Sequence, residues 1–250
     1  MSMYRPLLLA ICWSISSLLF AQVSPSQLDA LNQSYEKLKE REKALLAEIE
    51  EVKLDLLRQD LHRNGLPAIQ AGEKIIHHSA LSLVYDESHE QAKWVAHIIT
   101  KDIRTGKEAR SNDFREDPKV VTGSAVEEDY FLKFLQADNS YTYDGYGYDR
   151  GHLAPSADFR WSAKALSESY FYSNMSPQAP EFNRGKWAEL EGFIRSYLYR
   201  NTETQLYVVT GPVLREDLPK VSRSVNGVSL PKLYFKAVVD LKNERAIGFI

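Results

Sequence analysis

The strongest constraint on the fold is a run of regularly spaced apolar residues near the N-terminus. Between residues 28 and 56, successive positions at alternating steps of three and four are apolar or aromatic with one exception. The members of this seam are Leu28, Leu31, Tyr35, Leu38, Glu42, Leu45, Ile49, Val52 and Leu56. Such spacing predicts a long helix with one apolar stripe, as in a coiled coil. The segment Asn64-Gly65-Leu66-Pro67 then supplies residues that end a helix.

Two arrangements fit this seam, which lies in a segment that we assign to residues 22–66. In the first, the helix pairs with the helix of a second copy, and the protein forms a homo-oligomer. Glu42 is the polar member of the seam and weakens a parallel pairing unless it finds a partner or points outward. In the second arrangement, the helix packs against its own domain. The spacing alone fits both.

The segment before the helix has the pattern of a secretory signal peptide. Arg5 precedes an apolar run from Leu7 to Phe20, and Ala21 is a small residue at the expected cleavage point. We therefore assign residues 1–21 to a signal peptide. The mature protein is expected to be exported, periplasmic or secreted, with no stable membrane association after cleavage. An uncleaved N-terminal anchor is the alternative, although the apolar run is short for a membrane span.

In residues 67–250 the apolar residues recur over shorter segments and intervals than in the helix. This pattern predicts one α+β domain with a mixed or antiparallel sheet. Strands are predicted at 75–85, 94–103, 206–210, 233–241 and 246–250, and helices at 162–172 and 187–198. A short helical segment is predicted at 127–137, and a loop rich in Tyr, Gly and Asp at 139–147. Because the sequence stops within the last predicted strand, we expect either an edge strand or a truncated C-terminus.

Charge and motif content narrow the classes of function. The net charge is −3, from 31 Lys and Arg against 34 Asp and Glu. The surface as a whole therefore exerts no strong pull on nucleic acid or on an anionic membrane, and any polyanion must bind a local cluster of positive groups. The sequence contains no zinc-binding spacing, Walker loop, GxSxG or GxGxxG.

The segment richest in reactive groups is Asp149-Arg150-Gly151-His152. A guanidinium is a bidentate ligand for phosphate, and a neutral imidazole is a base near neutral pH. Gly151 allows a tight turn, so that Arg150 and His152 face one cleft. The alternative is a surface turn in which Asp149 pairs with Arg150 and His152 has no role.

Side chains that suit a magnesium ion follow this segment. Asn174 and Asn183 offer neutral oxygen ligands, and Glu191 binds the ion either directly or through a metal-bound water. Arg195 lies one helical turn after Glu191. The alternative is structural: Glu191 and Arg195 form an ordinary helix pair, and Asn183 caps a helix.

Together these segments resemble the DNA/RNA non-specific endonuclease family. The resemblance rests on DRGH at 149–152, on the segment from Ser173 to Gln178, and on an N-x-G-x-W-x-x-L-E pattern from Asn183 to Glu191 with an arginine beyond. It extends more weakly over residues 75–250, which leaves the N-terminal helix outside. The family's fold implies that residues 67–250 form the endonuclease domain, with a ββα-metal finger that presents the histidine and the asparagine together.

The resemblance also implies how the metal and the nucleophile are handled. His152 is the general base that takes a proton from the attacking water. Asn183 is the direct protein ligand of one Mg²⁺, for which Mn²⁺ substitutes. Glu191 orients metal-bound water.

The remaining candidates are implied to hold the substrate. Arg150 and Arg195 offset negative charge in the transition state, Asn174 supports the site, and Arg110 is a further phosphate contact. Because none of these groups reads a base edge, we expect an endonuclease that hydrolyses both DNA and RNA. Two alternatives stay open: a narrower phosphodiesterase, and a coiled-coil envelope or adaptor protein whose nuclease-like domain only binds polyanions.

Overall fold

A computed structural model describes residues 24–250, so the predicted signal peptide lies outside the described residues. The chain divides into two compact units, Met1–Glu48 and Ile49–Ile250, and each is described by itself. Helix α1 (Pro25–Asn64) contributes to both units. Its bounds confirm the long helix predicted from the seam. No helix among the described residues combines the length and the apolar character that a membrane crossing needs.

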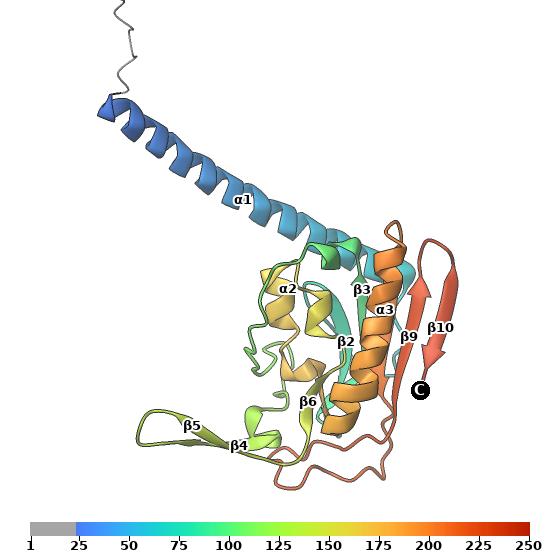
Figure 1. Cartoon of the computed structure of the whole chain (residues 1–250). Coiled ribbons are helices and arrows are strands. Elements are labelled where there is room, and N and C mark those ends of the chain that lie inside the picture. The colour runs from blue at the N-terminus through green and yellow to red at the C-terminus, as the bar shows by residue number, and fades with distance from the viewer. Residues whose placement is uncertain (1–23) are drawn as a thin grey trace, which may run out of the picture. The chain divides into compact units, whose positions relative to one another are not determined.

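Within residues 49–250, six strands form one antiparallel sheet in the order β1-β2-β3-β8-β9-β10 (Figure 1). The strands are β1 (Ile75–His77), β2 (Leu81–Asp86), β3 (Gln91–Ile99), β8 (Leu206–Pro212), β9 (Tyr234–Asp240) and β10 (Arg245–Phe249). All five predicted strand segments fall in this sheet, although a turn divides the first of them. The last strand, β10, pairs only with β9 and is therefore an edge strand.

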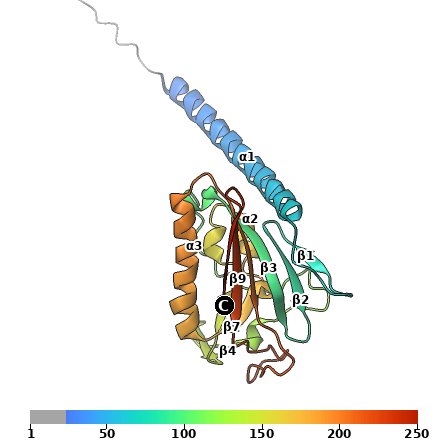
Figure 2. The same cartoon turned by 90° about the vertical axis from the view of Figure 1, so that its right-hand side faces the viewer.

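Successive side chains of a strand point to opposite sides of the sheet, and in the main sheet the side chains on both sides are packed against other elements. Trp94 and Ile98 of β3 pack in one cluster with Leu57 of α1. On the other face, Ile99 packs in a cluster with Leu198 of helix α3 (Ala188–Arg200). Figure 2 shows α3 running along that side of the sheet. This packing gives α3 a fixed position from which its polar face carries the candidate residues.

Both predicted helices are confirmed, the first with shorter bounds and the second with nearly the same bounds. Helix α2 (Ala163–Glu168) begins after Ser162, whose Oγ accepts a hydrogen bond from the Ala165 amide at 3.0 Å, as expected of a cap. Helix α3 is preceded by a kinked helical segment, η5 (Phe182–Trp187), whose kink lies at Gly185. Short 3₁₀ helices make up the rest: η1 (Lys101–Arg104), η2 (Glu127–Asp129), η3 (Ser156–Asp158) and η4 (Tyr172–Asn174).

Two small antiparallel sheets in residues 49–250 correct the sequence prediction. One is the hairpin β4 (Phe131–Leu135) and β5 (Tyr141–Gly145), which extends away from the main sheet (Figure 1). The predicted helical character of 127–137 is therefore confirmed only at 127–129, where η2 lies, and is wrong for 131–135; the predicted loop at 139–147 is wrong for 141–145. The other pairs β6 (Asp149–His152) with β7 (Met175–Gln178). These two strands and α3 make up the ββα unit that carries the candidate site.

Candidate active site

The DRGH segment forms strand β6, so its four side chains point alternately to the two sides of the strand. Asp149 and Gly151 share one face of β6, and Arg150 and His152 share the other. The predicted tight turn at Gly151 is therefore wrong, although Arg150 and His152 do face the same side. Gly151 is needed for a different reason: a Cβ at this position would overlap the side chain of Gln178 on β7.

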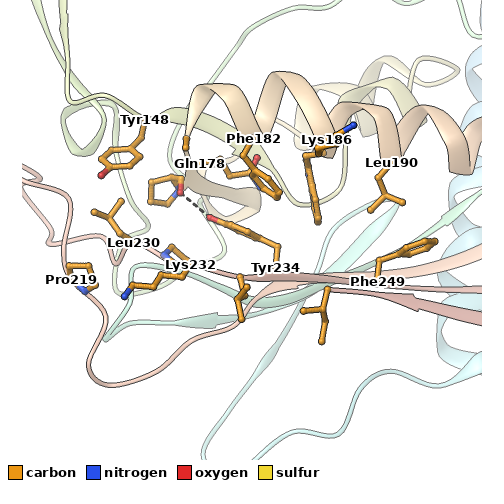
Figure 3. Close-up of a pocket in the computed structure, with 16 residues that line it drawn as sticks. Tyr148, Gln178, Phe182, Lys186, Leu190, Pro219, Leu230, Lys232, Tyr234 and Phe249 are labelled. Carbon is orange, nitrogen blue, oxygen red and sulfur yellow. Dashed lines mark hydrogen bonds between the residues drawn. The ribbon is translucent and has the colours of Figure 1, made fainter.

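The segment that carries Asn183 is fixed to the sheet by an aromatic cluster. The ring of Phe182 stacks on Tyr234 of β9 with centroids 5.5 Å apart, and Trp187 lies 5.4 Å from Phe182 and 5.7 Å from Tyr234. Tyr234 also donates a hydrogen bond to the carbonyl of Pro177, 2.9 Å away (Figure 3). Residues on either side of Asn183 are thus packed against β7 and β9.

Asp149 connects this segment to β6. Its Oδ2 accepts hydrogen bonds from Nδ2 of Asn183 at 2.9 Å and from Nε of Arg184 at 2.8 Å. A second bond joins Arg184 to Oδ1 at 2.6 Å, so the guanidinium is bidentate. The hydrogen bonds and the arginine lower the pKa of Asp149, although burial opposes them. With Nδ2 engaged, the amide oxygen of Asn183 accepts no hydrogen bond from the described residues.

A cavity of about 510 Å³ gathers several of these groups. Its charged lining consists of three arginines and one aspartate: Arg110, Arg150, Arg184 and Asp149. Asn183 lines it as well. The guanidinium of Arg150 lies 3.6 Å from the ring centre of Phe114, which holds it in place. An excess of positive charge in a small concave site suits an anionic group such as phosphate.

His152 is buried beside this cavity. Its ring contacts Tyr170 edge-on at 5.0 Å and Phe114 at 5.8 Å. Nε2 is buried and pairs with no described residue. Burial lowers the pKa of His152 to about 3, and the positive charges of Arg110 and Arg150 act in the same direction. The imidazole is therefore neutral at physiological pH, the form in which it can accept a proton.

Glu191 and Arg195 lie on α3 and do not line the cavity. Burial raises the pKa of Glu191 to about 7, while the charges of Lys236, Arg195 and Arg110 lower it. Arg195 pairs with the buried Asp158 at 3.1 Å. Arg110 thus influences both His152 and Glu191, which places the helix carboxylate within electrostatic reach of the cavity.

Asn174, predicted as a candidate ligand and a supporting residue, has a structural position. It is fully buried. Its amide nitrogen donates to the carbonyls of Ala154 at 2.9 Å and Ser169 at 2.8 Å, and its oxygen accepts from the Ala154 amide at 2.9 Å. The side chain braces the chain just after β6, and the structure gives it no path to a bound metal.

Sequence reasoning missed two groups next to the candidates. Arg184 stands at a variable position of the pattern that begins at Asn183, so the pattern assigns it no role. Lys236 of β9 is fully buried, where it donates to Thr210 Oγ1 at 2.6 Å and to the carbonyl of Leu153 at 3.3 Å. Burial lowers the pKa of Lys236 to about 8. The sequence gives no sign that Lys236 is buried near the candidate residues, because the groups that its amine contacts are far from it along the chain.

The donor set fits a hard divalent cation that keeps most of its waters. Asn183 offers one free amide oxygen toward a cavity that its side chain lines. Glu191 is a carboxylate in electrostatic reach of the same region. No cluster of three or more His, Cys, Asp or Glu side chains able to hold a metal occurs in residues 24–250. Oxygen donors of this kind, an amide and a carboxylate, suit a hydrated Mg²⁺.

Comparison with known proteins identifies the family. Residues 58–250 match the DNA/RNA non-specific endonuclease family. The chain belongs to this family. Over 189 residues it is 31% identical to mitochondrial endonuclease G of Homo sapiens, which covers 72% of this chain and 58% of that protein. It is 30% identical over 184 residues to a nuclease of Serratia marcescens, covering 74% of this chain and 65% of the relative.

The solved structures agree with the family assignment. A chain in the crystal structure of an EndoG/EndoGI complex matches with a TM-score of 0.55 and 26% identity, over 75% of each chain. This match confirms the α+β fold with antiparallel sheets that the resemblance implied. The family match begins at residue 58, which lies inside α1. The chain spans 58% of the length of the human and bovine endonuclease G that it matches.

Proposed function

We propose that this family member is a Mg²⁺-dependent endonuclease that hydrolyses DNA and RNA phosphodiesters. One observation carries the proposal: Asn183, held by Asp149, lines a cavity with three arginines, next to a strand that presents Arg150 and a neutral His152 on one face. Phosphodiester hydrolysis needs a base, positive charge around the phosphate and stabilisation of the leaving oxygen.

His152 acts as the general base. Its Nε2 is buried, so the proton of the attacking water is accepted at Nδ1. The lowered pKa makes the imidazole a weaker base. It also keeps the ring unprotonated, and so able to accept a proton, beside two arginines. Accepting the proton becomes easier when the anionic phosphate enters, because its charge offsets those of Arg110 and Arg150.

The arginines bind the phosphate, and Asn183 holds the metal. Arg150 and Arg110 line the cavity and offset the charge of the transition state. Mg²⁺, or Mn²⁺ in its place, supplies Lewis-acid stabilisation of the leaving oxygen when bound. Glu191, on α3, would help to hold the hydrated ion through its carboxylate. Arg195, paired with Asp158, supports the charge balance around Glu191.

These groups address phosphate alone, which supports cleavage of both DNA and RNA. A narrower phosphodiesterase would share the same chemistry and differ in the substrates that reach the cavity. A polyanion-binding adaptor would need the arginines but no base. The neutral, buried His152 favours a catalytic function over the adaptor, because simple binding gains nothing from it.

The test is cleavage of supercoiled plasmid and of RNA by the full mature chain with Mg²⁺ or with EDTA. His152→Ala and Asn183→Ala are expected to abolish nicking without loss of secondary structure, because they remove the base and the metal ligand. Lys186→Ala, an exposed neighbour that pairs only with Glu189, is the matched control and keeps activity. Cleavage that persists in EDTA or in His152→Ala would contradict the proposal.

Export and self-association belong to the same proposal. The signal-peptide pattern supports an exported protein, periplasmic or secreted. The seam residues Ile49, Val52 and Leu56 are exposed, whereas α1 contacts its own domain through Leu54 and Leu57. A second copy of the helix would cover the seam, which supports a homo-oligomer.

A further inference from the structure

The hairpin of β4 and β5 presents two chemically different faces. In its register, Lys133 lies opposite Tyr143 and Leu135 opposite Tyr141. Residues two apart on a strand share a face, so one face contains the hairpin's aromatic rings apart from Phe134. We call this the stacking face; its members are Phe131, Lys133, Leu135, Tyr141 and Tyr143. The opposite face carries Leu132, Phe134, Thr142 and Asp144.

The two tyrosine rings of the stacking face are exposed. Tyr143 is 60% exposed and Tyr141 is 48% exposed, although each is a large apolar ring. The hydroxyl of neither tyrosine bonds to a described residue, so no hydrogen bond holds either ring in place. A two-stranded hairpin buries little by itself and gains little stability from such rings. Exposed rings grouped on one face of an extended hairpin are typical of a contact surface.

The stacking face continues directly from the cavity. Phe131 lines the cavity, and the guanidinium of Arg150 lies 4.9 Å from its ring centre. The ring of Phe131 meets Tyr143 edge-on at 5.4 Å. Further out, the ammonium of Lys133 lies 4.4 Å from the ring centre of Tyr141. One row of aromatic and cationic groups therefore leads from the proposed phosphate site to the end of the hairpin.

The charges on the two faces differ in sign. The stacking face carries Lys133 and no acidic residue; Glu127 of η2 lies 3.7 Å from that lysine. The acidic Asp144 is on the opposite face, where it pairs with Arg223 at 2.7 Å. Flat rings beside a cation match the bases and phosphates of a nucleic-acid strand.

We propose that the stacking face binds unpaired bases of the strand that flanks the scissile phosphate. The inference rests on the proposed function, because the phosphate in the cavity sets where the strand begins. Aromatic rings stack on any of the bases, so the hairpin enlarges the surface that contacts the substrate without adding sequence preference. Single-stranded DNA and RNA would gain more from it than a duplex, whose bases are stacked on each other.

The test measures binding without turnover. Fluorescence anisotropy follows a labelled oligothymidylate bound to the full mature chain in EDTA. Tyr141→Ala with Tyr143→Ala should raise the Kd about tenfold for each lost ring. Thr142→Ala, between them on the opposite face, is the matched control and should leave the Kd unchanged. Tyr141→Phe with Tyr143→Phe keeps both rings and should restore binding, while circular dichroism checks the fold.

The outcomes separate this inference from the proposed function. A Kd that is unchanged in the double alanine variant overturns the inference even if the protein cuts plasmid. The expected loss of binding supports it even if the wild type fails to cut. A double alanine variant that binds normally but loses mass in light scattering would show that the stacking face contacts another copy instead, which also overturns the inference.

Discussion

His152 and Glu191 illustrate how burial changes a residue's chemistry in opposite directions. Desolvation disfavours the charged form of each. It therefore lowers the pKa of His152 to about 3 and raises that of Glu191 to about 7. The histidine is neutral throughout the physiological range, whereas the glutamate changes charge within it. Sequence alone predicts activity that falls below about pH 6 as the histidine protonates; burial moves that event to far lower pH.

The pH profile of kcat/KM should follow Glu191. Activity is expected to rise as pH increases through about 7 and the carboxylate forms, because in the proposed mechanism the ionised form would help to hold the hydrated Mg²⁺. In Glu191→Gln the activity is expected to be low and free of this limb, since the amide does not titrate. Profiles of both proteins on plasmid DNA at saturating Mg²⁺ provide the measurement. An acid limb of the same midpoint in Glu191→Gln would contradict the assignment.

At this scale, much of the candidate site is visible in the sequence. The DRGH segment and the pattern from Asn183 onward point to the strand and the helical segment that meet at the cavity. The link between them is not visible, because Asp149 reaches Asn183 across 34 positions. Asn174 shows how little a residue type decides: an amide can serve a metal or a backbone, and here it braces the backbone at Ala154, next to β6.

At the scale of elements, the secondary structure predicted for 131–135 and 141–145 was wrong. In these segments the local residue pattern and the pairing between strands favour different structures. Apolar residues at 131, 132, 134 and 135 recur with a helical spacing, which suggested a helix. The Tyr-Thr-Tyr run at 141–143 alternates as a strand does, but Asp and Gly around it suggested a loop. Pairing of the two segments stabilises the strand form of both, and such pairing leaves no mark on either segment alone.

Helix α1 uses separate stripes for separate purposes. Leu54, Leu57 and Leu61 are buried in the domain, and none belongs to the seam. The fold-back arrangement predicted from sequence is therefore correct for the end of the helix, but through a different stripe. The seam residues themselves stay exposed.

Deleting residues 22–48 should convert an oligomer into a single chain. This deletion removes most of the seam and keeps Leu54, Leu57 and Leu61, so the domain is expected to retain its melting temperature. Light scattering of the mature and shortened chains measures the mass. A matched variant, Leu31→Glu with Leu38→Glu, should have the same effect without changing the length. The same number of chains per particle in all three proteins would rule out association through the seam.

At the scale of the whole molecule, Lys236 is a buried charge that the fold must accommodate. Burial lowers its pKa from 10.5 to about 8, and the carboxylates of Glu191 and Asp158 only partly oppose this. Below pH 8 the amine is charged in both the folded and the unfolded chain, so the full cost of burying the charge is present. Between pH 8 and 10.5 the unfolded chain binds more protons, and the free energy of unfolding rises with pH.

Urea unfolding across this interval should reveal the contribution of Lys236. Relative to Lys236→Met, the wild type is expected to gain about 3 kcal/mol of stability as pH rises through the interval, from about 1.4 kcal/mol per unit of pKa. The methionine variant cancels the contributions of other groups that titrate at alkaline pH. If the difference between the two proteins is constant with pH, the buried amine is not the source.

The two-residue period of β6 limits how the DRGH segment can change in length. One residue inserted before Gly151 would turn Arg150 to the side of the strand that meets Arg184, and would separate it from His152. Extra residues in the connection at 146–148 would leave the strand's two sides as they are. Insertions near this site are therefore compatible with the fold only in the connections that flank the strand, whatever chemistry its side chains perform.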